Sequence, residues 1–156
     1  MLCRQSSQYF SFFGKQIAEK YGKQCCRYNQ DGKPFSKQQS LDTFNKTKEF
    51  LEGWNLNDDG TALTRYFYLQ DYYKAPSIIN EIMEVDRSEP KNHPSVSVTN
   101  GDLLTIELKS QSINGLSHVD FELAILLSSI DYLSFLAVPV SSSRNYRREV
   151  RAWKQK

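Results

Sequence analysis

The sequence predicts an α+β domain in which three helices cover one face of a four-stranded antiparallel sheet, in the order α-β-β-α-β-β-α. Two pairs of short segments rich in β-branched and aromatic residues are each joined by a turn of Asn, Asp and Gly, which is typical of hairpins. Three other segments repeat apolar residues at helical spacing. The 156 residues are 39% hydrophobic and 24% charged, which is too apolar for a disordered chain and too polar for a membrane bundle.

The first half of the predicted domain contains a helix followed by a hairpin. Ser40 or Asp42 can cap the helix, because their side-chain oxygens accept hydrogen bonds from its first backbone N–H groups. Gly53 ends the helix after Glu52. The hairpin then consists of the strand Trp54–Leu56, the turn Asn57–Gly60 and the strand Leu63–Leu69.

The second half repeats this pattern of helix and hairpin. Asp71 can cap a helix over Tyr72–Val85, and the polar loop 86–92 follows it. The buried stripe of this helix is expected to consist of Tyr72, Ala75, Ile78, Ile79, Ile82 and Met83. The second hairpin is predicted as a strand through Val96 and Val98, a turn at Asn100 and Gly101, and the strand Leu103–Leu108.

The third helix is predicted to begin after Ser117, where the run from Ser117 to Asp120 is typical of a capping box. Its buried stripe is expected to consist of Leu123, Leu126, Ile130 and Leu133. The longer run Phe121–Val140 is mostly apolar, but acidic residues interrupt it and Pro139 closes it. A core helix that continues into an apolar tail therefore fits this run better than a membrane span.

The charges divide the chain into an acidic body and two basic ends. Residues 1–37 carry seven Lys or Arg and two acidic residues, a net charge of +5, and residues 141–156 carry six and one, also +5. Residues 38–140 carry seven basic and fifteen acidic residues, a net charge of −8. The sequence thus predicts a basic N-terminal arm with its linker, a domain over 38–140, and a basic C-terminal tail. Such ends contact an acidic surface of protein, RNA or anionic lipid, or are simply solvated.

The N-terminal arm has a composition close to that of a mitochondrial presequence. It contains Arg4 and Lys15, a polar run of Ser and Gln, and no acidic residue before Glu19. We therefore expect a mitochondrial protein with an uncleaved targeting arm.

Metal and cofactor motifs are missing from the sequence. The three cysteines show neither CxxC nor CxxH spacing, so no structural zinc site is expected. No phosphate-binding glycine loop occurs either. We therefore expect no bound cofactor.

Several short motifs along the domain follow one another as they do in a known family. They are Gly53-Trp54, Leu63-Thr64-Arg65-Tyr66-Phe67, Asp71-Tyr72-Tyr73-Lys74-Ala75, Asn92-His93-Pro94, Asn100, and Gly115-Leu116-Ser117 with Asp120 and Leu123-Ala124. In their order and spacing, residues 40–135 resemble the pterin-4a-carbinolamine dehydratase family. The resemblance implies dehydration of a 4a-hydroxy-tetrahydropterin. That reaction needs a base for a ring N–H and an acid for the departing hydroxyl group.

The resemblance also implies a site built from imidazoles. The family has His-His-Pro at the mouth of its pocket, a third His after the last strand, and an Asp at the start of the final helix. Here these positions hold Asn92, His93 and Pro94, then Gln111, and then Asp120. Asn and Gln do not exchange a proton near neutral pH, although both can hydrogen-bond a pterin edge. The predicted site therefore keeps His93 and Asp120 as remnant catalytic groups, with Asn92, Pro94 and Gln111 as substrate contacts.

Each candidate residue also has a structural explanation. His93 is equally a loop residue before a proline, and Asp120 is equally a helix cap. Asn92 and Gln111 are then polar residues at the edge of the sheet. His118 is either a replacement acid or an exposed residue in the first turn of its helix.

An eroded site between two basic ends favours a structural or accessory subunit of a larger, mitochondrial protein assembly. Residues 1–37 and 141–156 are its expected contacts, and a homodimer through the sheet edge is compatible with the family. An active 4a-hydroxytetrahydrobiopterin dehydratase is the first alternative. An RNA-binding accessory protein is the second, because Tyr146 and Trp153 alternate with Arg residues in the tail. We favour a protein surface over nucleic acid or anionic lipid.

Overall fold

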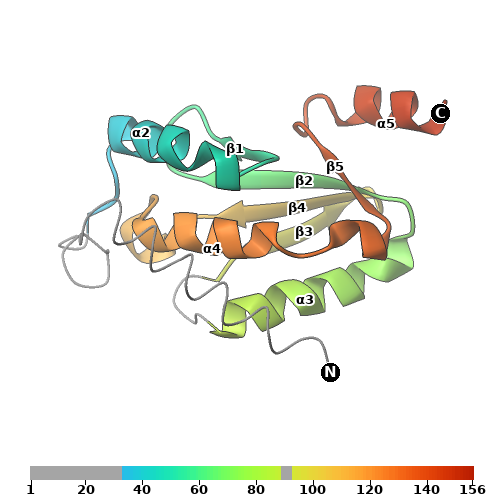
Figure 1. Cartoon of the computed structure of the whole chain (residues 1–156), viewed down its shortest axis with the longest axis horizontal. Helices are drawn as coiled ribbons and strands as arrows, with labels where there is room; N and C mark the ends of the chain where they lie inside the picture. Colours follow the sequence, from blue (N-terminus) through green and yellow to red (C-terminus); the bar gives the residue numbers. More distant parts are fainter. Residues whose placement is uncertain (1–32, 89–92) are drawn as a thin grey trace.

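A computed structural model describes residues 33–88 and 93–156 of the chain, and its sheet confirms the predicted α+β class (Figure 1). The sheet is antiparallel, with the order β1-β2-β4-β3, and a fifth strand, β5, also pairs with β2. The strands are β1 (Trp54–Leu56), β2 (Leu63–Leu69), β3 (Ser95–Thr99), β4 (Leu103–Leu108) and β5 (Ala137–Val140). The α-helices are α2 (Lys37–Thr47), α3 (Ala75–Ser88), α4 (His118–Ser128) and α5 (Tyr146–Lys154).

Helix α2 begins earlier than the sequence predicted. Its N-cap is Ser36, whose Oγ accepts a hydrogen bond from the backbone N–H of Gln39, while the Gln39 side chain accepts one from the Ser36 N–H. This reciprocal capping box satisfies two N–H groups at once, so it sets the start of the helix in preference to Ser40 or Asp42. A 3₁₀ turn over Lys48–Phe50 then extends the helix towards β1.

The first hairpin lies where it was predicted, and Asn57 holds its turn. The Asn57 side-chain oxygen accepts hydrogen bonds from the backbone N–H groups of Thr61 (2.7 Å) and Ala62 (3.1 Å). Gly60 has a φ of 71°, in the left-handed region that favours glycine. β1 and β5 share one edge of β2, because β1 pairs with residues 63–65 and β5 with residues 66–69.

Helix α3 starts later and ends later than predicted. Asp71 caps a 3₁₀ turn over Tyr72–Lys74, and the α-helix runs from Ala75 to Ser88. Ile78 and Ile82 are fully buried, as expected, whereas Tyr72 and Met83 are each 56% exposed and do not belong to the buried stripe. The additional last turn contains Asp86, which the sequence had placed in a loop.

The apolar run after Phe121 does not form the long core helix that was predicted. Helix α4 has the expected capping box at Ser117 but ends at Ser128, and Leu133 is 62% exposed in a 3₁₀ turn over Tyr132–Phe135. Ser128 and Ser129 donate hydrogen bonds from their hydroxyl groups to helix carbonyls, which competes with further helical turns. Leu136 adopts a left-handed φ of 58°, and the chain then returns along β2 as β5.

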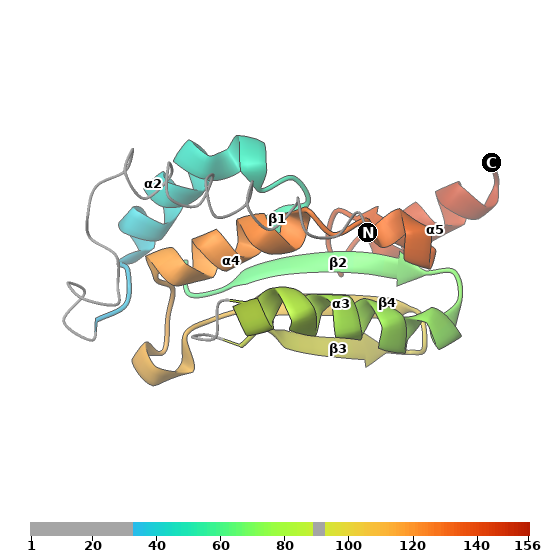
Figure 2. The same ribbon diagram turned by 60° about the horizontal axis from the view of Figure 1, so that its bottom comes forward.

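The sheet separates two apolar clusters. Alternate residues of β2, among them Leu63, Phe67 and Leu69, belong to a large core with residues of α2, α3 and α4. Figure 2 shows α3 and α4 running along the direction of β2, β3 and β4. Tyr66 and Tyr68 point to the opposite face, where α5 covers the sheet. This second cluster consists of Tyr68, Val138, Val140, Tyr146 and Val150, with Tyr66 and Leu103 packed against it. The C-terminal residues predicted as a tail thus contain a helix that packs on its own chain.

Across residues 33–88 and 93–156, no helix has the length and apolarity needed to span a membrane. α4 agrees with this finding, since it has only 11 residues.

Candidate active site

The imidazole of His93 contacts a carboxylate. His93 lies two residues before β3, and Asp86 lies in the last turns of α3. The distance from His93 Nδ1 to Asp86 Oδ2 is 2.6 Å. The His93 side chain is 75% exposed, whereas the Asp86 side chain is only 13% exposed. The ring is therefore anchored on one side and open to solvent on the other.

This contact fixes the orientation of the imidazole ring. A carboxylate beside Nδ1 accepts the Nδ1–H, which leaves the Nε2 lone pair of a neutral ring pointing away from the protein. Asp86 Oδ1 is buried and has no hydrogen-bond partner among the described residues, so Asp86 makes its contact through Oδ2 alone. One imidazole held in this way can accept or donate one proton.

Asp86 was not among the predicted site residues. The sequence placed it in a polar loop because Ser, Glu, Pro and Lys follow it closely. The available signal was the helical pattern of α3, which continues beyond Val85. A longer helix places the Asp86 carboxylate beside His93.

Asp120 acts as a buried cap of α4. Its residue is 0% exposed, and its Oδ2 accepts three hydrogen bonds of 2.8 Å. The donors are the backbone N–H of Ser117, the Ser117 hydroxyl group and the Ser110 hydroxyl group. A carboxylate that is enclosed by its own donors has a structural role here, which agrees with the capping explanation of this residue.

Two of the other predicted site residues, Pro94 and Gln111, lie at the same end of the sheet as His93. β3 and β4 pair with Ser95 opposite Glu107, so the residues just before β3 and just after β4 lie at the same end of these two strands. Gln111 follows two residues later, is exposed, and starts the 3₁₀ turn Gln111–Ile113. Pro94 is half-buried, and Asn92 lies outside the described residues. That these side chains line one pterin pocket stays a prediction.

His118 is not an exposed residue, and its ring packs against another aromatic side chain. It is half-buried at the first position of α4, and its ring meets the Phe35 ring edge-on with centroids 4.6 Å apart. Burial lowers the pKa of His118 below its usual value of about 6.5, because the charged form loses hydration. The neutral ring is thus the form that packs against Phe35.

The stability of the protein is expected to fall on acidification, partly through His118. The unfolded chain binds a proton at His118 as the pH falls through about 6.5, whereas the folded protein resists this until a lower pH. The contribution of the neutral His118 to stability is therefore complete above about pH 6.5 and is lost as the pH falls from there to the lower pKa of the folded protein. Thermal unfolding at about pH 8 and about pH 5.5 measures the loss, which should be smaller in His118→Phe. The same pH dependence in both proteins would assign the titration to another group.

Among residues 33–88 and 93–156, no three His, Cys, Asp or Glu side chains are placed to hold a metal ion. The three cysteines all precede residue 33.

Known proteins match the same stretch of the chain. Residues 34–130 match the family model described as pterin 4 alpha carbinolamine dehydratase. A protein of Xylella fastidiosa (strain M12) with the name "Putative pterin-4-alpha-carbinolamine dehydratase" is 31% identical over 80 residues, which are 51% of this chain and 67% of that protein. A protein of the same name from Xanthomonas euvesicatoria pv. vesicatoria (strain 85-10) is 33% identical over 71 residues, 46% of this chain and 58% of that protein.

A solved structure is also similar. The crystal structure of a transcriptional coactivator/pterin dehydratase from Brucella melitensis covers 66% of this chain and 98% of its own, with 18% sequence identity and a TM-score of 0.49.

The family match covers more than half of the chain. It runs from just before α2 to just after α4, and it includes all five predicted site residues together with Asp86. β5 and α5 lie beyond it. The chain belongs to the pterin-4a-carbinolamine dehydratase family.

Proposed function

We propose that this chain is a weakly active or inactive relative of the pterin dehydratases that serves as an accessory subunit of a larger protein assembly. The observation that carries the first part is the burial of Asp120 beneath its three donors. Asp120 is used as a cap, and Asn92 and Gln111 stand at positions where the family has imidazoles, so His93 is the one predicted site residue that carries an imidazole. Dehydration of a carbinolamine needs both a base and an acid.

A stopped-flow assay of carbinolamine dehydration tests the loss of activity. We expect Asn92→His with Gln111→His to raise the rate about tenfold or more, because a positioned general acid or base contributes roughly 10²- to 10⁴-fold. The control variant, Gln70→His, adds an imidazole at an exposed position beyond the other end of β2 and should leave the rate unchanged. An unmodified protein that is already as fast as the double variant would contradict the proposal.

An active dehydratase is the second candidate, and the contact between His93 and Asp86 favours it. At 2.6 Å, the Asp86 carboxylate is placed to hold His93 with Nε2 facing solvent. If the protein is active, the same assay should show a rate loss of about 100-fold or more in His93→Ala and a smaller loss in Asp86→Asn.

Residues 1–37 and 141–156 are the proposed contacts with the assembly, and the basic charge of both ends supports this. α5 uses Tyr146 and Val150 within its own chain, but Trp153 is 46% exposed on the same helix. An exposed Trp among Arg residues is typical of protein interfaces. The presequence-like composition of the N-terminal arm supports a mitochondrial location for the assembly.

Deleting residues 1–32 is expected to release the protein from its assembly. This deletion keeps the Ser36 cap of α2, so the domain should remain folded. Native size-exclusion chromatography of cell extract should show the full chain in a large species and the shortened chain at the size of a monomer or dimer. Trp153→Ala is the companion variant at the other end. Elution of both variants with the large species would rule out these contacts.

The free edge of β3 supports a proposed homodimer. β3 is the last strand in the order β1-β2-β4-β3, and among the described residues it pairs with β4 alone. An open antiparallel edge can pair with the same strand of a second copy.

A further inference from the structure

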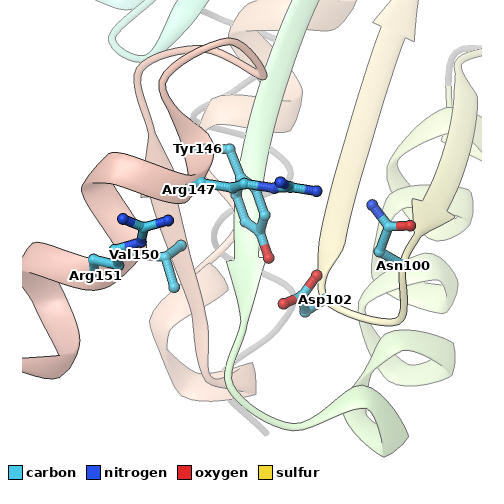
Figure 3. Close-up of a pocket in the computed structure, with 6 residues that line it drawn as sticks. All are labelled: Asn100, Asp102, Tyr146, Arg147, Val150 and Arg151. Carbon is cyan, nitrogen blue, oxygen red and sulfur yellow. The ribbon is translucent and has the colours of Figure 1, made fainter.

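The outer face of the sheet holds a cavity that α5 creates. Its volume is about 420 Å³, and it lies between α5 and the turn from β3 to β4 (Figure 3). Its lining residues are Asn100, Asp102, Tyr146, Arg147, Val150 and Arg151. This volume falls within the range of small-molecule sites, although the cavity is wide open to solvent on one side.

This cavity is separate from the candidate active site. His93 precedes β3, whereas Asn100 follows it, so the two sites lie at opposite ends of the strand. Four of the six lining residues belong to α5, which lies beyond the family match at residues 34–130. The cavity is therefore a feature of this chain's C-terminal extension.

Two guanidinium groups give the cavity its positive charge. Arg147 and Arg151 are one helical turn apart, both are exposed, and neither forms an ion pair with another described residue. Glu149, the acidic residue of α5, is engaged elsewhere, because its carboxylate accepts hydrogen bonds from the backbone N–H and the hydroxyl group of Ser141. A pair of free Arg side chains is suited to binding a phosphate or carboxylate group.

The opposite wall carries hydrogen-bonding groups of different kinds. Asn100 has a left-handed φ of 56° in the turn, and its side-chain amide lies beside the cavity, as does the Asp102 carboxylate (Figure 3). From α5, the hydroxyl group of Tyr146, a residue that is only 8% exposed, points toward Asp102. Burial and the nearby Asp102 carboxylate raise the pKa of Tyr146, so its hydroxyl stays protonated.

We propose that this cavity binds a small phosphate monoester that carries hydroxyl groups, with Arg147 and Arg151 on the phosphate and Asp102 on the hydroxyl groups. The two Arg side chains balance a phosphate dianion, whereas Asp102 would repel it and therefore faces the hydroxylated end. The Val150 side chain and the Tyr146 ring supply an apolar wall for the carbon skeleton. Inorganic phosphate has no hydroxylated carbon skeleton, so it would make no hydrogen bonds with Asp102.

Titration of the full chain with ribose 5-phosphate, inorganic phosphate and ribose tests this proposal by ¹H–¹⁵N NMR. We expect saturable binding of ribose 5-phosphate with a Kd below about 1 mM, with shifts at Asn100, Asp102 and Tyr146. Inorganic phosphate should bind about tenfold more weakly, and ribose should not bind measurably. Absence of saturation by ribose 5-phosphate up to about 10 mM would overturn the proposal.

Two variants separate this cavity from a generally basic helix. Arg147→Gln with Arg151→Gln should weaken ribose 5-phosphate binding at least about tenfold. Arg148→Gln is the matched control, because Arg148 is an exposed residue of the same helix that does not line the cavity, and it should leave binding unchanged. Equal losses in both proteins would overturn the proposal. Tighter binding of a single-stranded RNA oligonucleotide, equally sensitive to Arg148→Gln, would also overturn it and would assign the helix to nucleic acid.

Discussion

Asp120→Ala should lower the free energy of unfolding by about 3 kcal/mol. The substitution removes an acceptor that is 0% exposed and leaves three donors from Ser110 and Ser117 without it. Hydrogen bonds to a charged group contribute about 1.5–3 kcal/mol each, and unsatisfied buried donors add a desolvation cost. Urea unfolding followed by circular dichroism measures the change.

Asp131→Ala is the matched control for Asp120→Ala. Asp131 is also an Asp at a helix N-cap, but it is exposed and accepts one bond of 3.3 Å from the backbone N–H of Ser134. Its removal should cost about 1 kcal/mol or less. A large loss of dehydration rate in Asp120→Ala without any loss of stability would instead return Asp120 to the catalytic groups.

Phe67→Ala should cost about 4 kcal/mol, since truncation of a fully buried Phe leaves a cavity in the core. Phe67 is 0% exposed, and its ring stacks on the Tyr132 ring with centroids 4.1 Å apart. The Arg65 guanidinium lies 4.9 Å from the Phe67 ring centroid and 5.1 Å from that of Tyr132, so the two rings also shelter a buried cation. Burial lowers the pKa of Arg65 and raises the pKa of Tyr132.

Tyr66→Ala provides the comparison for Phe67→Ala within the same strand. Tyr66 is half-buried on the opposite face of β2, beside the smaller cluster. Its truncation should cost less than half as much in the same urea experiment. Equal costs for the two substitutions would mean that the two faces of the sheet contribute alike.

The hairpins could be predicted from the sequence because their signals are local. β2 has the predicted bounds Leu63–Leu69, and the second turn falls at Asn100 and Gly101, both with positive φ. Alternating residues and turn residues act over a few positions, so no distant contact is needed to recognise them.

β5 and α5 could not be predicted in this way. Residues 137–140 follow a helical apolar run, and they form a strand only because the edge of β2 beyond β1 is open to them. In α5, Tyr146 and Val150 are one turn apart, but basic residues surround them and conceal the short apolar face. Pairing with the edge of β2 decides β5, and packing on the outer face of the sheet decides α5.

The candidate site could be predicted in part. The sequence singled out His93, whose catalytic role stays a prediction, and one of its two explanations for Asp120 was the helix cap that the bonds from Ser110 and Ser117 fit. Asp86 could not be paired with His93 because the contact depends on the final turn of α3. One additional helical turn therefore decides whether Asp86 lies in a loop or contacts the His93 imidazole.

The shared edge of β2 has a consequence for the order of folding. β1 reaches that edge through a short hairpin, whereas β5 reaches it only after α3, β3, β4 and α4 have been passed along the chain. Closing a long loop costs more chain entropy than closing a short one, and such pairings form late. The edge of β2 at residues 66–69 is therefore covered last. Until β5 pairs there, a strand of a second unfolded chain competes with β5 for the same backbone hydrogen bonds.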